Sequence, residues 1–296
     1  MHLEEGDLRA LERAVELLEQ DTIIHYMHLE EGDLRALERA VELLEQDTIT
    51  ETLTQLVGTP IDYLMSKLPK GAEEQIYSLV EKSLHKAADA ALWSLDNEPN
   101  RIASTKTNKF FAAVSGAIGG AFGFSALAIE LPVSTTIMLR SIADIARSEG
   151  FELDNIDTKL ACLEVFSLGG PSDDDDAANT AYYATRSLTA EIVQDLSKEI
   201  SNIAVKNASS VQTGKWLASL IEKVATRFGI VITEKMAAQV VPVIGALTGA
   251  TLNTMFTDYY QDMARGHFIV KRLEKKYGNE LIKAEYIKIS SKLTNS

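Results

Sequence analysis

The sequence FFAAVSGAIGGAFGFSALAI, which occupies residues 110–129, contains no charged side chain. A second uncharged run, MAAQVVPVIGALTGATLNTMFT, occupies residues 236–257. A helix of about 20 residues is about 30 Å long, which suits both the centre of a large helical protein and the hydrocarbon layer of a membrane. We therefore predict that these two uncharged runs form the central helices of the fold.

Small residues recur within both uncharged runs at a helical spacing. Gly116 and Gly120 stand four residues apart in the first run, as do Gly245 and Gly249 in the second. This spacing allows two helix backbones to approach closely, so we expect the runs to pack against each other. Their abundance of Ala, Gly, Ser and Thr makes membrane insertion only modestly favourable, which favours a buried core over a permanent span. Reversible insertion, or attachment to a membrane surface, is the alternative.

The rest of the chain also carries helical patterns. In residues 72–95 the apolar positions fall on one helical face. No alternation typical of strands and no hairpin turn stands out. The predicted fold class is therefore all-α, a multi-helix bundle around the two glycine-rich, charge-free helices. The further helices expected are residues 50–68 with a turn at 58–60, 133–146 after Pro132, 154–168, 177–204, 216–228 before Gly229, and 258–277 before Gly278.

The formal net charge of −14 is concentrated at the N-terminal end. Residues 1–49 hold 14 acidic and 4 basic side chains, so the remaining chain carries only −4. Because no basic footprint is present, nucleic acid is not expected as a partner. The single cysteine, Cys162, cannot form an internal disulfide, and the acidic N-terminus is unlike a secretory signal. We expect a cytoplasmic protein.

The N-terminal end contains an identical repeat. Residues 1–23 and residues 27–49 have the same sequence, and each forms an amphipathic helical stripe. Structural repeats normally differ at exposed positions, so identity indicates a recent duplication or an artificial addition. We therefore divide the chain into a duplicated segment, residues 1–26, and a single helical domain, residues 27–296, with Met27 as the expected natural start. The extra amphipathic helix is a candidate contact for a homo-oligomer.

Two groups of polar residues flank the uncharged runs. Arg140 and Asp144 are four residues apart, which favours an ion pair on one helical face. The groups are interpreted either as structural salt bridges or as a polar site at the ends of the central helices. We assign no catalytic residue, metal site or cofactor, because the known zinc, serine-nucleophile, phosphate-loop and dinucleotide patterns do not match. The candidate residues are Glu130, Arg140 and Asp144 beside the first run, and Asn253, Asp258 and His267 beside the second.

Several stretches of the chain resemble the bacterial EcsC protein family. They are LVGTPIDYLMSKLP at residues 56–69, GAIGGAFGFSALAIELPVSTTIMLRSIADIARSEG at 116–150, LEVFSLGG at 163–170, and VPVIGALTGATLNTMFTDYYQDMARGHFIVKRLEKKYG at 241–278. The resemblance implies a cytoplasmic or membrane-associated protein without an established catalytic activity. The family's name comes from a gene beside an ABC transporter, so the resemblance also implies an accessory role in transport or secretion.

These observations favour a non-enzymatic helical protein that associates reversibly with the inner membrane or with a membrane protein. A basic group near the C-terminus would face anionic lipid. The first alternative is a metal-dependent hydrolase of unknown substrate that uses Glu130, Asp144, Asp258 or His267. The second alternative is an oligomeric scaffold. The basic group consists of Lys271, Arg272, Lys275 and Lys276.

Overall fold

The computed structural model describes residues 29–91, 127–169, 180–190, 193, 210–240 and 249–294, and within these ranges every regular element is helical. The predicted all-α fold class is therefore confirmed. The elements are α2 (Glu31–Leu44), α3 (Ile49–Val57), α4 (Ile61–Met65), α5 (Ala72–Ala91), α7 (Leu127–Ser148), α8 (Ile156–Glu164) followed by the 3-10 turn η2 (Val165–Ser167), α10 (Ser210–Val240), α11 (Gly249–Tyr277) and α12 (Asn279–Thr294). Residues 181–190 are also helical.

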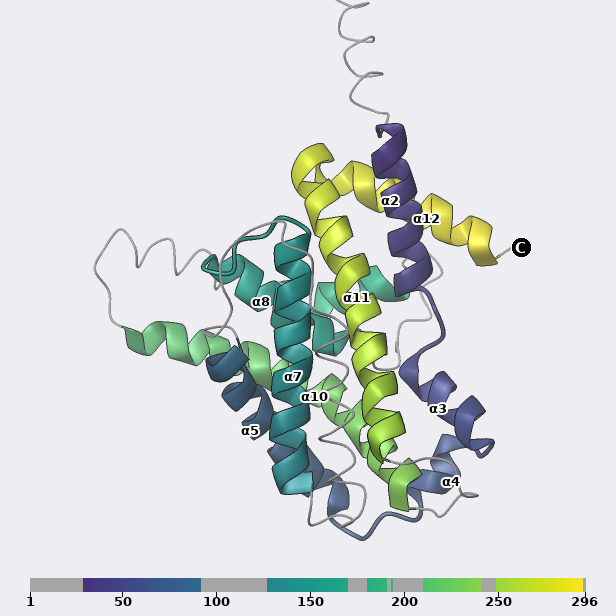
Figure 1. Ribbon diagram of the computed structural model, residues 1–296, viewed down its shortest axis with the longest axis vertical. Coiled ribbons are helices and arrows are strands. Elements are labelled where there is room, and N and C mark those ends of the chain that lie inside the picture. The colour runs from purple at the N-terminus through teal and green to yellow at the C-terminus, as the bar shows by residue number, and fades with distance from the viewer. Residues whose placement is uncertain are drawn as a thin grey trace, which may run out of the picture.

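The long helices α7 and α11 lie side by side and run in the same direction (Figure 1). Two side-chain contacts establish this direction. Gln261 Nε2 donates to Ser141 Oγ at 2.7 Å near the middle of both helices, and Arg272 Nε lies 3.3 Å from Glu149 Oε2 near their C-terminal ends. Because both partners advance together along the chain, the two helices also begin at the same end of the bundle.

The N-terminal helix α2 packs against α11 in the opposite direction. Its apolar stripe is buried as predicted, with Leu37 and Val41 fully inaccessible to solvent. The backbones approach closely at Gly266, where a Cβ atom would lie 2.6 Å from Leu44 Cγ and 3.1 Å from the carbonyl oxygen of Ala40. A glycine is therefore required at this crossing, because any larger residue would force α2 away from α11.

Other helices complete the core around this pair. Helix α5 packs against α7 and α10, and its predicted apolar face is buried through Ile76, Val80 and Leu84. Helix α8 is buried from Thr158 to Glu164, although that stretch includes the charged residues Lys159 and Glu164. A short helix buried all round needs internal partners for such groups, and this requirement leads to the buried clusters described below.

Two predicted helix ends are wrong. The helix expected after Pro132 begins at Leu127, so Pro132 lies inside α7. Proline there removes the partner only of the Ala128 carbonyl, and Ala128 is exposed at the first turn, where water can satisfy it. Gly229 does not end a helix either, because α10 continues through it to Val240. Tertiary packing of Phe228, Val231 and Ile232 outweighs the low helix propensity of glycine.

The predicted glycine contacts fall largely outside the described residues. Gly116, Gly120 and Gly245 lie outside them, and Gly249 is the first residue of α11. The second uncharged run is divided between two elements, since it supplies the end of α10 and the start of α11. Within the described part of the chain, no helix is both long enough and apolar enough to cross a bilayer.

Candidate functional site

A buried polar cluster joins the described ends of the two uncharged runs. Asn253 on α11 donates through Nδ2 to Glu130 Oε1 on α7 at 2.9 Å. Lys235 on α10 lies between them, with its Nζ 3.1 Å from Glu130 Oε1 and also bonded to Asn253 Oδ1. The exposed fraction of the side chain is 2% for Lys235 and 6% for Glu130. This Glu130–Lys235–Asn253 cluster therefore links three helices in a region without solvent.

The cluster also places the described ends of three helices together. Lys235 and Asn253 would lie about 27 Å apart in one unbroken helix, at about 1.5 Å per residue. Their direct hydrogen bond places the end of α10 beside the start of α11 instead. The contact of Asn253 with Glu130 places the start of α11 beside the start of α7.

The remaining candidates near α7 are distributed differently. Asp144 is buried and forms an ion pair with Arg147, three residues later on the same helix. Arg140 is exposed, and Asp258 on α11 is half-buried. The predicted grouping of Glu130, Arg140 and Asp144 is thus spread along α7, and only Glu130 joins the cluster with Asn253.

His267 belongs to a second buried cluster, further along α11. Its Nδ1 atom lies 3.0 Å from the hydroxyl of Tyr182, which in turn accepts from Arg186 Nη1 at 3.3 Å. The Tyr182 proton is then directed to Nδ1, which assigns the ring proton of a neutral His267 to Nε2. That Nε2 atom lies 3.9 Å from Glu164 Oε2. The cluster joins α8, α11 and the helix of residues 181–190.

The charges around His267 are balanced without a charge on the ring. Arg186 forms a bidentate pair with Glu274 at 2.7 and 3.1 Å, and Lys271 Nζ lies 4.0 Å from Glu164 Oε2. Burial, together with the positive charges of Lys271 and Arg186, holds the pKa of His267 well below its ordinary value of 6.5. A protonated His267 would be a third cation among two carboxylates, so the neutral ring is a structural acceptor in this arrangement.

The predicted lipid-facing basic group lies at the C-terminal end of α11, opposite the Glu130–Lys235–Asn253 cluster. Lys276 Nζ contacts Glu30 Oε1 at 2.9 Å and Asp33 Oδ2 at 2.8 Å. Arg272 contacts Asp33 and Glu149 at 3.5 and 3.3 Å. These contacts hold the start of α2, whereas Lys275 is exposed.

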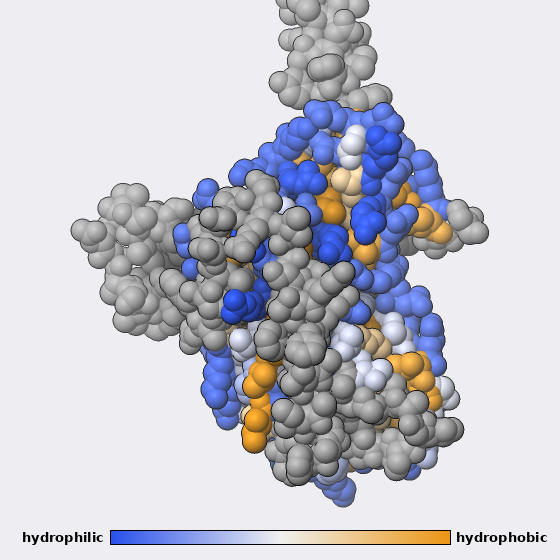
Figure 2. Space-filling view, viewed as in Figure 1, coloured by the Kyte–Doolittle hydropathy of each residue, from blue (hydrophilic) through white to orange (hydrophobic). Residues whose placement is uncertain are grey.

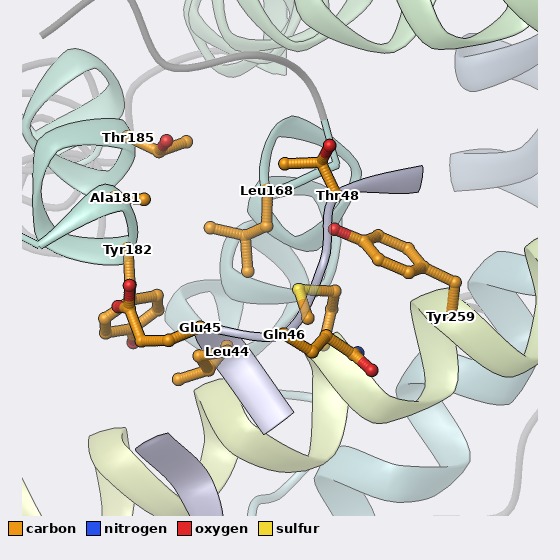
Figure 3. Close-up of a pocket in the computed structure, with 10 residues that line it drawn as sticks. Leu44, Glu45, Gln46, Thr48, Leu168, Ala181, Tyr182, Thr185 and Tyr259 are labelled. Carbon is orange, nitrogen blue, oxygen red and sulfur yellow. The ribbon is translucent and has the colours of Figure 1, made fainter. Parts of the chain in front are cut away.

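A small pocket of about 100 Å³ opens where α2 leads into α3. Figure 3 shows Leu168 near its centre, with the Tyr259 hydroxyl directed toward Thr48. Burial raises the pKa of Tyr259, so this hydroxyl stays protonated. The lining combines apolar and uncharged polar groups with the single carboxylate of Glu45, and none of the sequence-derived candidates lines it.

The predicted candidate residues thus lie in separate clusters. Glu130 and Asn253 are brought together by a direct hydrogen bond, and three important partners were missed: Lys235, Glu164 and Arg186. Lys235 directly precedes an uncharged run, which is a signal that could have identified it. Glu164 and Arg186 show no such signal, because their partners are distant in sequence. No group of three or more His, Cys, Asp or Glu residues suited to a metal ion occurs in the ranges that the structure covers.

Comparison with known proteins gives one match. The sequence model described as the EcsC protein family matches residues 23–273. No curated protein and no solved structure matches the chain.

The Glu130–Lys235–Asn253 cluster predicts a coupled effect of substitutions. Lys235→Met leaves the buried Glu130 carboxylate without its cation, and should lower the free energy of unfolding by about 3–5 kcal/mol. Adding Glu130→Gln removes the uncompensated charge, so the double variant should be more stable than Lys235→Met alone. Urea denaturation measures both. Lys223→Met, at an exposed lysine on the same helix, is the control; an equal effect at both lysines would contradict the assignment.

His267 predicts a pH dependence of stability. Its pKa is depressed in the folded protein, so just below pH 6.5 the unfolded chain binds a proton that the native protein does not. The contribution of neutral His267 to the free energy of unfolding is therefore complete above pH 6.5. It declines as the pH falls, by about 1.4 kcal/mol per pH unit. Urea denaturation between pH 7.5 and 5.5 should show a shallower pH dependence for His267→Gln than for the wild type. Equal slopes in the two proteins would refute this role.

Proposed function

The chain belongs to the EcsC protein family, and from this premise we propose that it is a non-enzymatic helical protein that binds reversibly to a membrane surface. The contact is made by the end of the bundle at which α7 and α11 begin. This end, called the apolar end below, is defined by the first turns of α7 and α11 and the end of α10.

The observation that carries the proposal is the exposed apolar surface where α7 begins. Ile129, the last residue of the first uncharged run, has an exposed fraction of 73%, and Val133, one turn later, has 46%. Ala128 beside them is also exposed. Figure 2 shows hydrophobic surface at the lower end of the molecule, where α7 begins in Figure 1. An exposed apolar ridge that continues an uncharged run is typical of a membrane or protein contact.

The polar groups near this end are directed inward. Glu130 follows Ile129 directly, yet its side chain is buried against Lys235 and Asn253. Because these charges are neutralised inside the bundle, docking of the apolar end on lipid would not require desolvating them again. The Glu130–Lys235–Asn253 cluster thus supports a contact surface made of apolar side chains such as those of Ile129 and Val133.

The choice of the apolar end over the basic group rests on geometry. Helices α7 and α11 are parallel, so residues 271–276 lie at the end of α11 opposite Ile129 (Figure 1). A single docking orientation therefore uses one end or the other. Arg272 and Lys276 are already engaged with Asp33, which lessens their attraction for anionic lipid.

A role beside a membrane transport or secretion protein agrees with this proposal. The catalytic alternative receives no support from the geometry, since Asp144 and His267 lie in different clusters, each paired with neighbouring side chains. We therefore place the function in binding rather than in chemistry.

Flotation with liposomes tests the proposal. Wild-type protein should float with vesicles that contain anionic lipid. Ile129→Gln should reduce the vesicle-binding constant roughly tenfold, because glutamine removes apolar contact area without adding charge. The control is Leu293→Gln on α12, which removes another exposed large apolar side chain, with an exposed fraction of 46%, outside the apolar end.

Lys275→Gln distinguishes membrane contact through the apolar end from contact through the basic group. The apolar-end proposal expects this variant to bind vesicles nearly as well as the wild type at physiological salt. Loss of binding in Lys275→Gln together with full binding in Ile129→Gln would assign the contact to the basic group, and no binding of wild-type protein at low salt would remove membrane association altogether.

A further inference from the structure

The surface that holds α2 recognises side chains from a short stretch of the chain. Leu37, Ala40, Val41 and Leu44 supply the apolar contacts with the core. Asp33 accepts from Lys276 and from the Tyr277 hydroxyl, both at 2.8 Å. At the other end of the stretch, Glu45 accepts from the Tyr286 hydroxyl at 2.7 Å. Helices α11 and α12 therefore bind residues 30–45 through both apolar and charged contacts.

Every one of these recognised side chains occurs a second time in the chain. Residues 1–23 repeat residues 27–49 without a difference. Nothing in the surface formed by α11 and α12 distinguishes one copy from the other. The counterparts of Asp33, Leu37, Ala40, Val41, Leu44 and Glu45 are Asp7, Leu11, Ala14, Val15, Leu18 and Glu19.

We propose that the surface of α11 and α12 that holds α2 is a docking site for either copy, and that residues 5–18 of the same chain are its second occupant. The protein then exchanges between two registers. In the first register α2 occupies the site, and in the second register residues 5–18 occupy it with the same contacts.

Helix α3 keeps its position in both registers. Its cap joins Thr48 and Glu51, with the Glu51 backbone N–H donating to Thr48 Oγ1 at 3.2 Å and Thr48 N donating to Glu51 Oε2 at 2.7 Å. Leu53, which has no counterpart in the repeat, is buried beneath it. Helix α3 is therefore held in place by its own segment, in which Glu51 and Leu53 lie outside the repeat, and only the connection from the docked copy to α3 changes during exchange.

The change in that connection sets the ratio of the two registers. Residues 45–48 join α2 to α3, whereas residues 19–48 would join the docked first copy to the same helix. The connecting loop becomes about sevenfold longer, which on the loop-closure relation disfavours the second register roughly twentyfold. The register with residues 5–18 docked is thus a minor species in the wild type. It becomes the main species when a substitution prevents α2 from docking.

The second occupant is a segment of the same chain rather than of another molecule, because tethering gives it a higher effective concentration at the docking site. A tethered copy samples the docking site at millimolar effective concentration, well above that of a second molecule at micromolar protein. Rescue of a damaged α2 should therefore be independent of protein concentration. A concentration-dependent rescue, accompanied by a dimer in sedimentation, would overturn docking within the chain and assign the occupant to a second molecule.

A double-mutant cycle on the full chain tests the proposal. Leu37→Asp places a carboxylate in a fully buried position, so α2 can no longer dock. With residues 5–18 intact, urea denaturation should show the unfolding constant raised only about twentyfold, the ratio of the registers. With Leu11→Asp added, no copy can dock, and the rise should be on the order of a thousandfold or more.

Leu11→Asp alone should leave the unfolding constant unchanged, so the two substitutions are strongly coupled. If Leu11→Asp has the same effect with and without Leu37→Asp, the proposal is overturned. The same conclusion follows if Leu37→Asp alone prevents folding, or if the double variant is as stable as the wild type. Glu38→Lys and Glu12→Lys, at an exposed position of α2 and its counterpart, form the control cycle and should show no coupling.

Discussion

The buried contact of Lys235 with Glu130 and Asn253 is the constraint on which the rest of the structure depends. Removing an ammonium and a carboxylate from water costs several kcal/mol each, and their attraction offsets this only when the geometry is good and further hydrogen bonds are present. The amide of Asn253 supplies those bonds to both partners. The three side chains come from α7, α10 and α11, so the contact holds the ends of three helices in one arrangement.

This arrangement separates the molecule into two ends of different character. Because α7 and α11 run in parallel, exposed Ile129 and the Glu130–Lys235–Asn253 cluster lie at one end, and the contacts of Asp33 with Arg272 and Lys276 lie at the other. The acidic start of α2 thus neutralises the basic end of α11, whereas Ile129 at the other end has an exposed fraction of 73%.

Local signals predicted much of the fold. The helix ends at Gly58 and Gly278 were anticipated, and these glycines have positive φ angles of 66° and 91°, which favour glycine. The apolar stripe of α2 and the buried face of α5 follow directly from 3.6-residue periodicity. Pro132 and Gly229 misled because their cost to a helix is small beside the burial of neighbours such as Leu131 and Phe228.

The candidate site was predicted only in part, for a physical reason. Glu130 and Asn253 stand beside the uncharged runs and were identified by that position. Their shared cation, Lys235, lies on α10 and reaches them through the packing of α10 against the starts of α7 and α11, which a single sequence does not measure directly. The cluster of His267 with Glu164 and Arg186 likewise depends on helix packing between residues that are far apart in the chain.

The parallel packing of α7 and α11 is tested most directly by distances between spin labels. In a Cys162→Ala background, labels at the exposed positions 129 and 251 should be separated by less than about 20 Å, since both helices begin at the same end. Labels at 129 and 275 should be at least about 30 Å apart, because α11 rises about 1.5 Å per residue between positions 251 and 275. A shorter distance from 129 to 275 than from 129 to 251 would contradict the account.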